Sequence, residues 1–363
     1  MNTINKNRIQ DFLYPENGPR IVSIGTANPG TRYSQEEIVK IYHETNPVIV
    51  GLFQNSHIKY RHLILPEPVD GIMQEETQEQ LIRKHRQGAE EFGAKAITEC
   101  LSLVNLTPRD IDFLCCVSST GFLCPGITAR LIKKMNFREN VHRIDILGMG
   151  CNAGLNAINP VVSFARCNPG KNALMVCTEI CSAAYVYNKS INTAVVNSLF
   201  GDGVAAVLVR QDNCDTWKRG PIVQDFESHI IVESIEAMKF ELEQNKLSFF
   251  LDRDIPYVIG MNIEKPVSRL LKRNNLKLRH IKHWLVHSGG KKVLDAIEYN
   301  LGLTDYDVRH TLHILQNFGN LSSGSFLFSY KELCKEQIIE EGDLGVAITM
   351  GPGTTIETAL LVW

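Results

Sequence analysis

The chain has 363 residues, with 38 Lys and Arg against 40 Asp and Glu, and a formal net charge of −2. This balance gives no overall field that would attract nucleic acid or an anionic membrane. No apolar run approaches the ~18 residues needed to cross a bilayer, and the N-terminus carries no continuous apolar signal segment. We therefore expect a cytoplasmic protein that binds neither nucleic acid nor membrane.

Short apolar strands alternate with amphipathic helices along the chain. In order, the sequence predicts a strand from Arg20, a helix over 78–105, a strand over 111–119 and a helix over 126–135. Such alternation is typical of βα units around a largely buried sheet. No low-complexity linker divides the chain, so the prediction is α/β throughout.

Ten cysteines raise the question of disulfides or zinc. Cys115 and Cys116 are adjacent, Cys177 and Cys181 are four residues apart, and no C-x-x-C pair occurs. Most lie within apolar runs, which is typical of small buried thiols in a reducing compartment. Only Cys151, which is flanked by glycines, has a context that suggests chemistry.

Three pairs of segments indicate an internal duplication. The string HIKHWLVHSGG begins 170 residues after DIDFLCCVSST, and GNLSSGSFL begins 169 residues after GCNAGLNAI. A third pair, GDGVAAVLV and GDLGVAITM, is separated by 141 residues, which indicates a longer insert in one half. Two related halves predict a layered α/β core with the active site where they meet.

The string GMGCNAGLN, residues 148–156, allows three interpretations. It satisfies the G-x-G-x-x-A pattern of a dinucleotide loop, but residues 146–178 contain no Asp or Glu to hold a ribose. A buried structural thiol is the second interpretation. The third is a nucleophile at the start of a helix that begins at Cys151, where the helix dipole would favour the thiolate and make this cysteine the most readily alkylated.

A nucleophile also needs a proton acceptor and donors for a developing oxyanion. His287 ends the predicted strand that corresponds to residues 111–119, and Asn320 lies beside the position that corresponds to Cys151. Alone, each is more typical of a packed histidine or a helix cap. Their joint placement by the duplication favours a Cys–His–Asn site.

The glycines around the cysteine have an expected role in this interpretation. Gly148 and Gly150 would allow the tight turn from strand to helix that presents Cys151. Gly154 would let the buried helix pack closely, against its counterpart in the other half.

The glycine-flanked cysteine, HSGGKKVLDAI, FGNLSSGS and MGPGTTIE together resemble type III polyketide synthases of the chalcone and stilbene synthase family. The resemblance runs from about Ile21 to Trp363 and is greatest to the bacterial branch that makes 3,5-dihydroxyphenylacetyl-CoA from malonyl-CoA alone. It implies a thiolase-like αβαβα fold of two pseudo-duplicated halves. Residues 1–215 would carry the cysteine, and residues 216–363 the histidine and asparagine.

The resemblance also implies roles for individual residues. Cys151 would carry the acyl chain, with His287 and Asn320 completing the catalytic triad. Phe200 and Phe249 match the family's two gatekeeper phenylalanines. The remaining residues of the implied substrate pocket are Cys124, Ser322, Gly351, Pro352 and Gly353.

The sequence departs from plant members of the family where they hold the CoA phosphates. Gly51 and Asn55 stand at the positions of those basic residues. CoA binding is expected instead from Lys59 or Arg61, or from a basic cluster that alternatively forms a solvated helix face. That cluster comprises Arg83, Lys84 and Arg86.

The resemblance implies a homodimer that uses malonyl-CoA and needs neither a metal nor a redox cofactor. Plant members insert a methionine into the neighbouring subunit's site, and here that position is Cys124. Two alternatives stay open from the sequence. One is an acyl-CoA-primed synthase of pyrones or resorcinols, and the other is an inactive partner subunit with the same fold.

Overall fold

The computed structural model of the protein describes residues 18–67, 73–184, 186–212, 220–243 and 245–363. The predicted boundary between residues 1–215 and 216–363 falls within 213–219, outside the described residues. The first half contains β1 (Arg20–Ala27), β2 (Arg32–Ser34), α2 (Gln35–Ile41), α3 (Pro47–Gln54), β3 (Tyr60–His62), α4 (Gln78–Ser102), β4 (Phe113–Ser118), α5 (Ile127–Met135), β5 (His142–Leu147), α6 (Ala153–Cys167), β6 (Ala173–Glu179), α7 (Ile191–Leu199) and β7 (Gly203–Arg210).

The second half continues the alternation of strands and helices. Its elements are β8 (Ile222–Ile230), β9 (Met238–Glu243), β10 (Lys246–Leu251), α8 (Ile255–Asn262), α9 (Glu264–Arg273), β11 (His283–Val286), α10 (Lys291–Leu301), α11 (Arg309–Phe318), α12 (Ser325–Glu336), β12 (Leu344–Gly351) and β13 (Thr355–Val362). Two 3₁₀ turns are important for the site, η2 (Gly150–Asn152) and η7 (Ser322–Gly324).

The four elements expected from the first half of the sequence are confirmed as β1, α4, β4 and α5. A capping box sets the start of α4. The Gln80 N–H donates to Thr77 Oγ1 at 3.2 Å, and the Thr77 N–H donates to Gln80 Oε1 at 2.7 Å. Helix α5 is capped at its C-terminus by Asn136, whose φ of 56° lies in the left-handed region common at helix ends.

Nine strands form one sheet in the order β11-β12-β13-β8-β1-β7-β6-β4-β5. The two halves of the sheet meet where β8 lies beside β1. Counted outward from there, one half has the order β1, β7, β6, β4, and the other has the corresponding order β8, β13, β12, β11. Both series run through two antiparallel pairs and then one parallel pair. The sheet therefore repeats, and the predicted relation between β4 and β11 is confirmed.

The third sequence pair is wrong in detail. The segment from Gly201 forms β7, whereas the segment from Gly342 forms β12, which is the counterpart of β6. The strands look alike in sequence because each is buried on both faces and carries the same small apolar residues.

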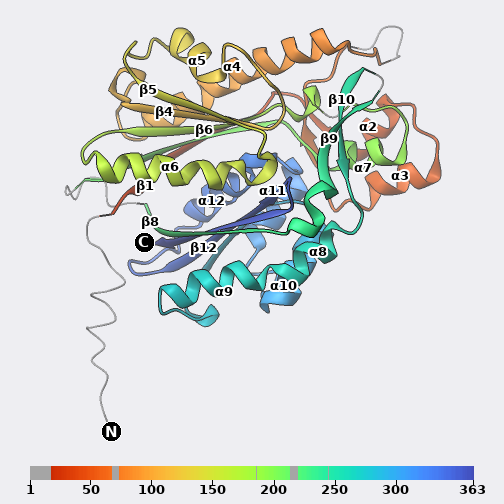
Figure 1. Cartoon of the computed structure of the whole chain (residues 1–363). Coiled ribbons are helices and arrows are strands. Elements are labelled where there is room, and N and C mark those ends of the chain that lie inside the picture. The colour runs from red at the N-terminus through yellow and green to blue at the C-terminus, as the bar shows by residue number, and fades with distance from the viewer. Residues whose placement is uncertain (1–17, 68–72, 185, 213–219, 244) are drawn as a thin grey trace.

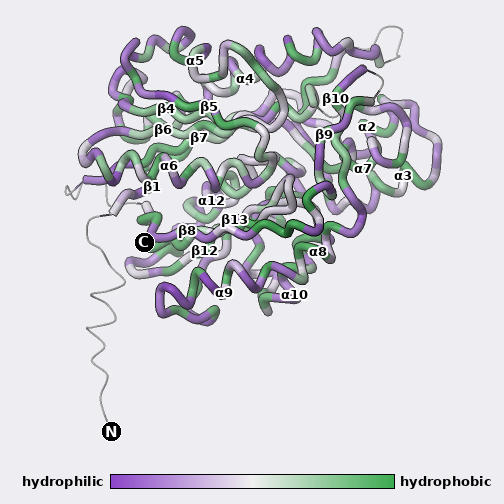
Figure 2. Tube along the Cα trace, viewed as in Figure 1, coloured by the Kyte–Doolittle hydropathy of each residue, from purple (hydrophilic) through white to green (hydrophobic). Residues whose placement is uncertain are grey.

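Five layers stack as α, β, α, β, α, which confirms the predicted fold (Figure 1). Helices α4 and α5 cover one outer face, α8, α9 and α10 cover the other, and α6, α11 and α12 lie between the two parts of the sheet (Figure 1). Hydrophilic residues follow the outer helices, while the strands between them are mostly hydrophobic (Figure 2). Within the described residues, no helix has both the length and the apolar character to span a bilayer.

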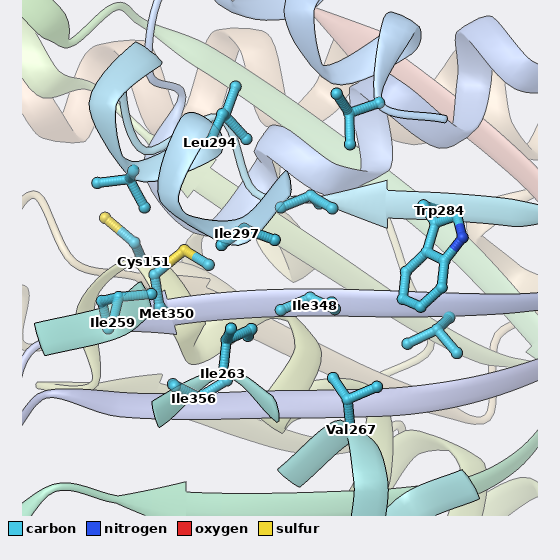
Figure 3. Packing of buried hydrophobic residues seen from close by; sticks show 14 of the residues in the cluster. Cys151, Ile259, Ile263, Val267, Trp284, Leu294, Ile297, Ile348, Met350 and Ile356 are labelled. Atoms are coloured by element: carbon cyan, nitrogen blue, oxygen red, sulfur yellow. The ribbon is translucent and has the colours of Figure 1, made fainter. Parts of the chain in front are cut away.

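Separate apolar clusters fill the spaces between the layers. The cluster beneath α8, α9 and α10 contains Trp284, Ile348, Met350 and Cys151. Figure 3 shows Cys151 at one end of this cluster and Trp284 at the other. The candidate nucleophile thus lies at the edge of a hydrophobic core.

Candidate active site

Cys151 lies in the turn between β5 and α6, in the 3₁₀ segment η2. The helix was expected to begin at the cysteine, but α6 begins two residues later, at Ala153. Gly148 and Gly150 have φ values of 80° and 66°, which confirms their predicted role in the turn. A Cβ on Gly150 would lie 2.1 Å from Cδ of Pro352, so no side chain fits there.

Helix α6 packs on η7, the turn that corresponds to η2 in the other half. A Cβ on Gly154 would lie only 2.2 Å from the carbonyl oxygen of Ser323, which confirms the expected close approach of the two halves. Across this contact the hydroxyl of Ser322 donates to Sγ of Cys151 at 3.5 Å. Ser322 is therefore placed beside the candidate nucleophile, Cys151.

Asn320 is held just before η7 by backbone bonds on both sides. Its N–H donates to the carbonyl of Leu199 at 2.9 Å, and its carbonyl accepts from the N–H of Gly201 at 2.9 Å. The side-chain Oδ1 accepts from the N–H of Ser322 at 2.8 Å. This bond orients the amide and leaves its NH₂ group to donate to an oxyanion.

His287 follows β11 and is 2% exposed. Its N–H donates to the carbonyl of Ile348 at 2.8 Å, and the next residue, Ser288, donates its hydroxyl to the carbonyl of Gly319 at 3.3 Å. The second bond joins the histidine segment to the one that holds Asn320. The ring Nδ1 is buried and has no hydrogen-bond partner among the described residues.

Burial opposes charge on both members of the expected thiol–imidazole pair. It raises the pKa of Cys151 to about 12, against a smaller lowering by the Ser322 hydrogen bond. It lowers the pKa of His287 to about 3. Cys151 is 8% exposed, so burial opposes the thiolate that the helix start was expected to favour.

The same values change the expected order of alkylation. Cys124, Cys167 and Cys334 are exposed, whereas Cys151 is buried with a raised pKa. Both features oppose the expected fast alkylation of Cys151.

A buried acidic residue, Glu179, connects both halves to Cys151. Glu179 is 0% exposed and accepts from Ser119 Oγ at 2.7 Å and from the hydroxyl of Ser323. The hydroxyls of Ser119 and Ser322 lie 2.7 Å apart, and Ser322 contacts Cys151. Burial raises the pKa of Glu179, and these hydrogen bonds lower it by less.

The sequence analysis did not identify Ser119 and Glu179. Their signal was present, since Ser119 directly follows β4 and Glu179 ends β6, two neighbouring parallel strands. The carboxyl ends of parallel strands meet at one edge of a sheet, where polar residues gather into sites.

Phe200 and Phe249, the two expected gatekeepers, contact each other. Their ring centroids are 6.0 Å apart at an interplanar angle of 81°, and both belong to the apolar cluster that contains Cys151. The sequence analysis missed Phe240, which pairs with Phe249 across the β9–β10 hairpin and has its centroid 5.2 Å from it. Cross-strand register supplies that third ring, and only the hairpin geometry reveals it.

The loop of Gly351, Pro352 and Gly353 also reaches the nucleophile. A Cβ on Gly351 would lie 3.0 Å from the backbone nitrogen of Cys151, and Gly353 has a φ of 74°. Cys124, by contrast, lies exposed on the loop between β4 and α5. It is therefore at the surface of its own chain rather than in the pocket.

Of the residues expected to bind CoA, Arg61 is misassigned. It is 1% exposed, and its guanidinium donates to the carbonyl of Phe200 and to Oε1 of Gln35, each at 2.8 Å. It holds the backbone next to Asn320 and does not face solvent. Lys59 is exposed, which leaves its expected role open.

The basic cluster on α4 is a helix face in part. Arg83 is exposed and pairs with Glu79 at 2.7 Å, one turn earlier. Lys84 is buried, where it pairs with Glu76 and donates to the carbonyl of Ser182 at 3.4 Å. These ion pairs favour the structural interpretation of the cluster.

Comparisons with known families agree with this geometry. A family model described as chalcone and stilbene synthases, C-terminal domain, matches residues 223–362. A second, described as FAE1/Type III polyketide synthase-like protein, matches residues 57–270.

Individual relatives extend over nearly the whole chain. The chain is 48% identical over 351 residues to a 3,5-dihydroxyphenylacetyl-CoA synthase of Streptomyces toyocaensis, covering 95% of this chain and 90% of that protein. The corresponding enzyme of Amycolatopsis orientalis is 48% identical over 347 residues, with coverages of 95% and 93%. The crystal structure of 1,3,6,8-tetrahydroxynaphthalene synthase from Streptomyces coelicolor superposes with a TM-score of 0.86 at 26% identity, covering 95% and 99% of the two chains. The chain therefore belongs to the type III polyketide synthases, acyltransferases of the chalcone and stilbene synthase family with a thiolase fold.

Proposed function

We propose that this enzyme makes 3,5-dihydroxyphenylacetyl-CoA from malonyl-CoA alone. The observation that carries the proposal is the meeting of Cys151 with the segment of Asn320 and Ser322 at the end of an apolar cluster. The near-half identity to two synthases of that name supports the product. CoA thioesters are the substrates, and the reaction needs no further cofactor.

Loading begins with a neutral thiol and a neutral imidazole. As Cys151 Sγ attacks the thioester carbonyl, its proton passes to the His287 ring, and CoA leaves as the thiol when that proton is returned. The burial of both groups keeps the charged pair from persisting between turnovers. Loading is thus coupled to the presence of substrate.

Chain extension uses loss of CO₂ to create the carbon nucleophile. Cleavage of the carboxylate bond of a malonyl thioester leaves its electron pair on the enolate, whose oxygen accepts from the NH₂ of Asn320 and from His287. Phe200 and Phe249 provide apolar walls that disfavour the free carboxylate. The enolate carbon then forms a bond to the acyl carbon on Cys151, and the thiolate leaves.

Ring closure requires a different proton transfer. The terminal carbon of the tetraketide loses a proton and bonds to an inner carbonyl carbon, whose oxygen gains a proton. Loss of one water and enolisation then give the dihydroxylated ring. Four malonyl-CoA thus yield one product, three CoA, four CO₂ and one water, with no net oxidation.

The chain Ser322–Ser119–Glu179 can carry these protons, because its hydroxyls both donate and accept and its carboxylate is buried. The same chain is not needed for extension, since loss of CO₂ supplies the electron pair there.

The proposal includes a homodimer in which Cys124 faces the neighbouring subunit. Strand β5 is an edge strand of the nine-stranded sheet, and its Ile144 and Leu147 are 39% and 36% exposed. Phe122, beside Cys124, is 74% exposed. An open edge with apolar side chains is a typical pairing surface, and light scattering after gel filtration would test the mass in solution.

Incubation of the purified enzyme with malonyl-CoA alone tests the function. Mass spectrometry should detect 3,5-dihydroxyphenylacetyl-CoA or its acid. A pyrone formed only after addition of an acyl-CoA primer, with no aromatic product from malonyl-CoA, would instead identify an acyl-primed synthase. Failure of both reactions by folded protein would identify an inactive member of the family.

A further inference from the structure

His85 is a buried histidine of α4 that the mechanism above does not use. It is 1% exposed, and burial lowers its pKa to about 4, so the ring is neutral. Its Nδ1 lies 3.4 Å from the hydroxyl oxygen of Thr120, while its Nε2 is buried with no hydrogen-bond partner among the described residues. A buried polar atom without a partner is destabilising, so the presence of an imidazole here requires an explanation.

The turn after β4 packs directly against the imidazole ring of His85. A Cβ on Gly121 would lie 2.3 Å from Cδ2 of His85 and 2.5 Å from its Cγ. Only the absence of a side chain lets the backbone lie so close to the ring. The ring therefore sets the path of the chain through Thr120 and Gly121.

The path of the backbone through Thr120 determines where Ser119 lies in the hydrogen-bonded series Ser322–Ser119–Glu179. The hydroxyl of Thr120 also accepts from the N–H of Ile180 at 2.9 Å. Thr120 follows Ser119, and Ile180 follows Glu179, so the Thr120–Ile180 bond lies beside the Ser119–Glu179 bond, and His85 contacts it through Thr120.

We propose that His85 is a positioning residue for ring closure, which holds Thr120 so that Ser119 stays between Glu179 and Ser322. The proposal rests on the proposed function. It separates two steps of that function, because extension draws its electron pair from CO₂ loss and ring closure requires a C–H proton to leave through the hydroxyls. Displacing Ser119 should therefore slow ring closure more than chain building.

Two substitutions divide the contributions of His85. His85→Phe keeps a flat ring under Gly121 but removes the bond to Thr120, and His85→Gln keeps a polar partner. With malonyl-CoA as sole substrate, the chain that does not close to the aromatic ring is released as a pyrone, which is a lactone. His85→Phe should lower the ratio of aromatic product to this lactone roughly 5- to 10-fold, the effect of losing one hydrogen bond. Malonyl-CoA consumption should fall less than about 2-fold, and His85→Gln should restore part of the ratio.

Matched variants complete the experiment. Phe92→Leu alters a buried apolar residue of the same helix and should leave the ratio unchanged. Thr120→Val removes the hydroxyl at nearly constant shape and should reproduce the effect of His85→Phe, which carries the test where the latter does not fold.

Product ratios and thermal unfolding, measured on the same preparations, decide the outcome. A His85→Phe enzyme with the wild-type ratio overturns the proposal, as does a parallel fall of both products with the unfolding temperature. A wild-type enzyme that makes lactone and no aromatic product overturns the proposed function instead, so the two failures are distinguishable.

Discussion

Replacing Gly154 by alanine tests whether the close contact of the two central helices sets the catalytic geometry. Gly154 lies one residue into α6, three residues after Cys151, and faces the η7 turn that carries Ser322. The added Cβ would lie 2.2 Å from the carbonyl oxygen of Ser323 and 3.1 Å from Sγ of Cys177. Neither the backbone carbonyl nor the buried thiol can turn away as a surface side chain could.

The size of the effect follows from that distance. Carbon and oxygen approach to about 3.3 Å without strain, so α6 and η7 must separate by about 1 Å. Overpacking of this kind costs roughly 1–3 kcal/mol of unfolding free energy. A 1 Å misplacement of reacting groups can cost ~10²-fold in rate, and here it would fall on the 3.5 Å contact between Ser322 and Cys151.

Gly324→Ala is the matched control, because it lies on the same contact from the other half. Its Cβ would meet only the Cβ atoms of Cys177 and Ala205, at 3.7 and 3.8 Å, and its backbone is right-handed helical. We expect this variant to retain activity within a few-fold. Malonyl-CoA turnover and urea unfolding of the wild type and both variants provide the comparison.

The reasoning fails if Gly154→Ala turns over malonyl-CoA at the wild-type rate. Equal losses in Gly154→Ala and Gly324→Ala would also refute it, since the effect would then come from any added methyl group and not from the close approach.

Three other substitutions have separate expected outcomes. Cys151→Ala should abolish both the acyl-enzyme seen by mass spectrometry and all condensation; residual condensation would assign the nucleophile elsewhere. Asn320→Ala should slow malonyl-CoA decarboxylation by ~10²-fold and loading much less, and equal losses would contradict its assigned role. Asp343→Asn should cost about 1.5–3 kcal/mol at pH 7. Burial alone would raise the pKa of Asp343, but it is lowered by bonds from Glu340 N–H, His283 and Lys282. Its contribution is therefore present above the ordinary value of 3.8 and is lost on further acidification, so the gap to wild type in urea titrations should narrow below about pH 4. A pH-independent gap would contradict this linkage.

Local patterns were sufficient to predict several features of the site. Gly148 and Gly150 predicted a turn that requires positive φ. The internal repeat predicted that the Asn320 segment lies opposite Cys151. Both features depend on backbone geometry within a few residues, which the sequence records directly. Helix α4 was predictable for the same reason, since its cap and its apolar face lie within one segment.

Properties that depend on burial or on contacts between remote segments were not predictable. Arg61 was assigned to CoA because it is basic, yet it lies 1% exposed under Phe200. The Cys151 thiolate was expected from the helix start, whereas burial of the thiol raises its pKa. Ser119 and Glu179 are 60 residues apart and meet only through the pairing of two strands. In each case the decisive quantity is distance from water or from a remote segment, which no local pattern specifies.

Serines of both halves hydrogen-bond to Glu179, so the two repeats of this protein depend on each other. Ser119 belongs to the first repeat and Ser323 to the second, so the carboxylate is solvated by both. A first repeat separated from the second would leave that buried group without the hydroxyl of Ser323. The two repeats therefore share one buried polar site, and neither satisfies it alone.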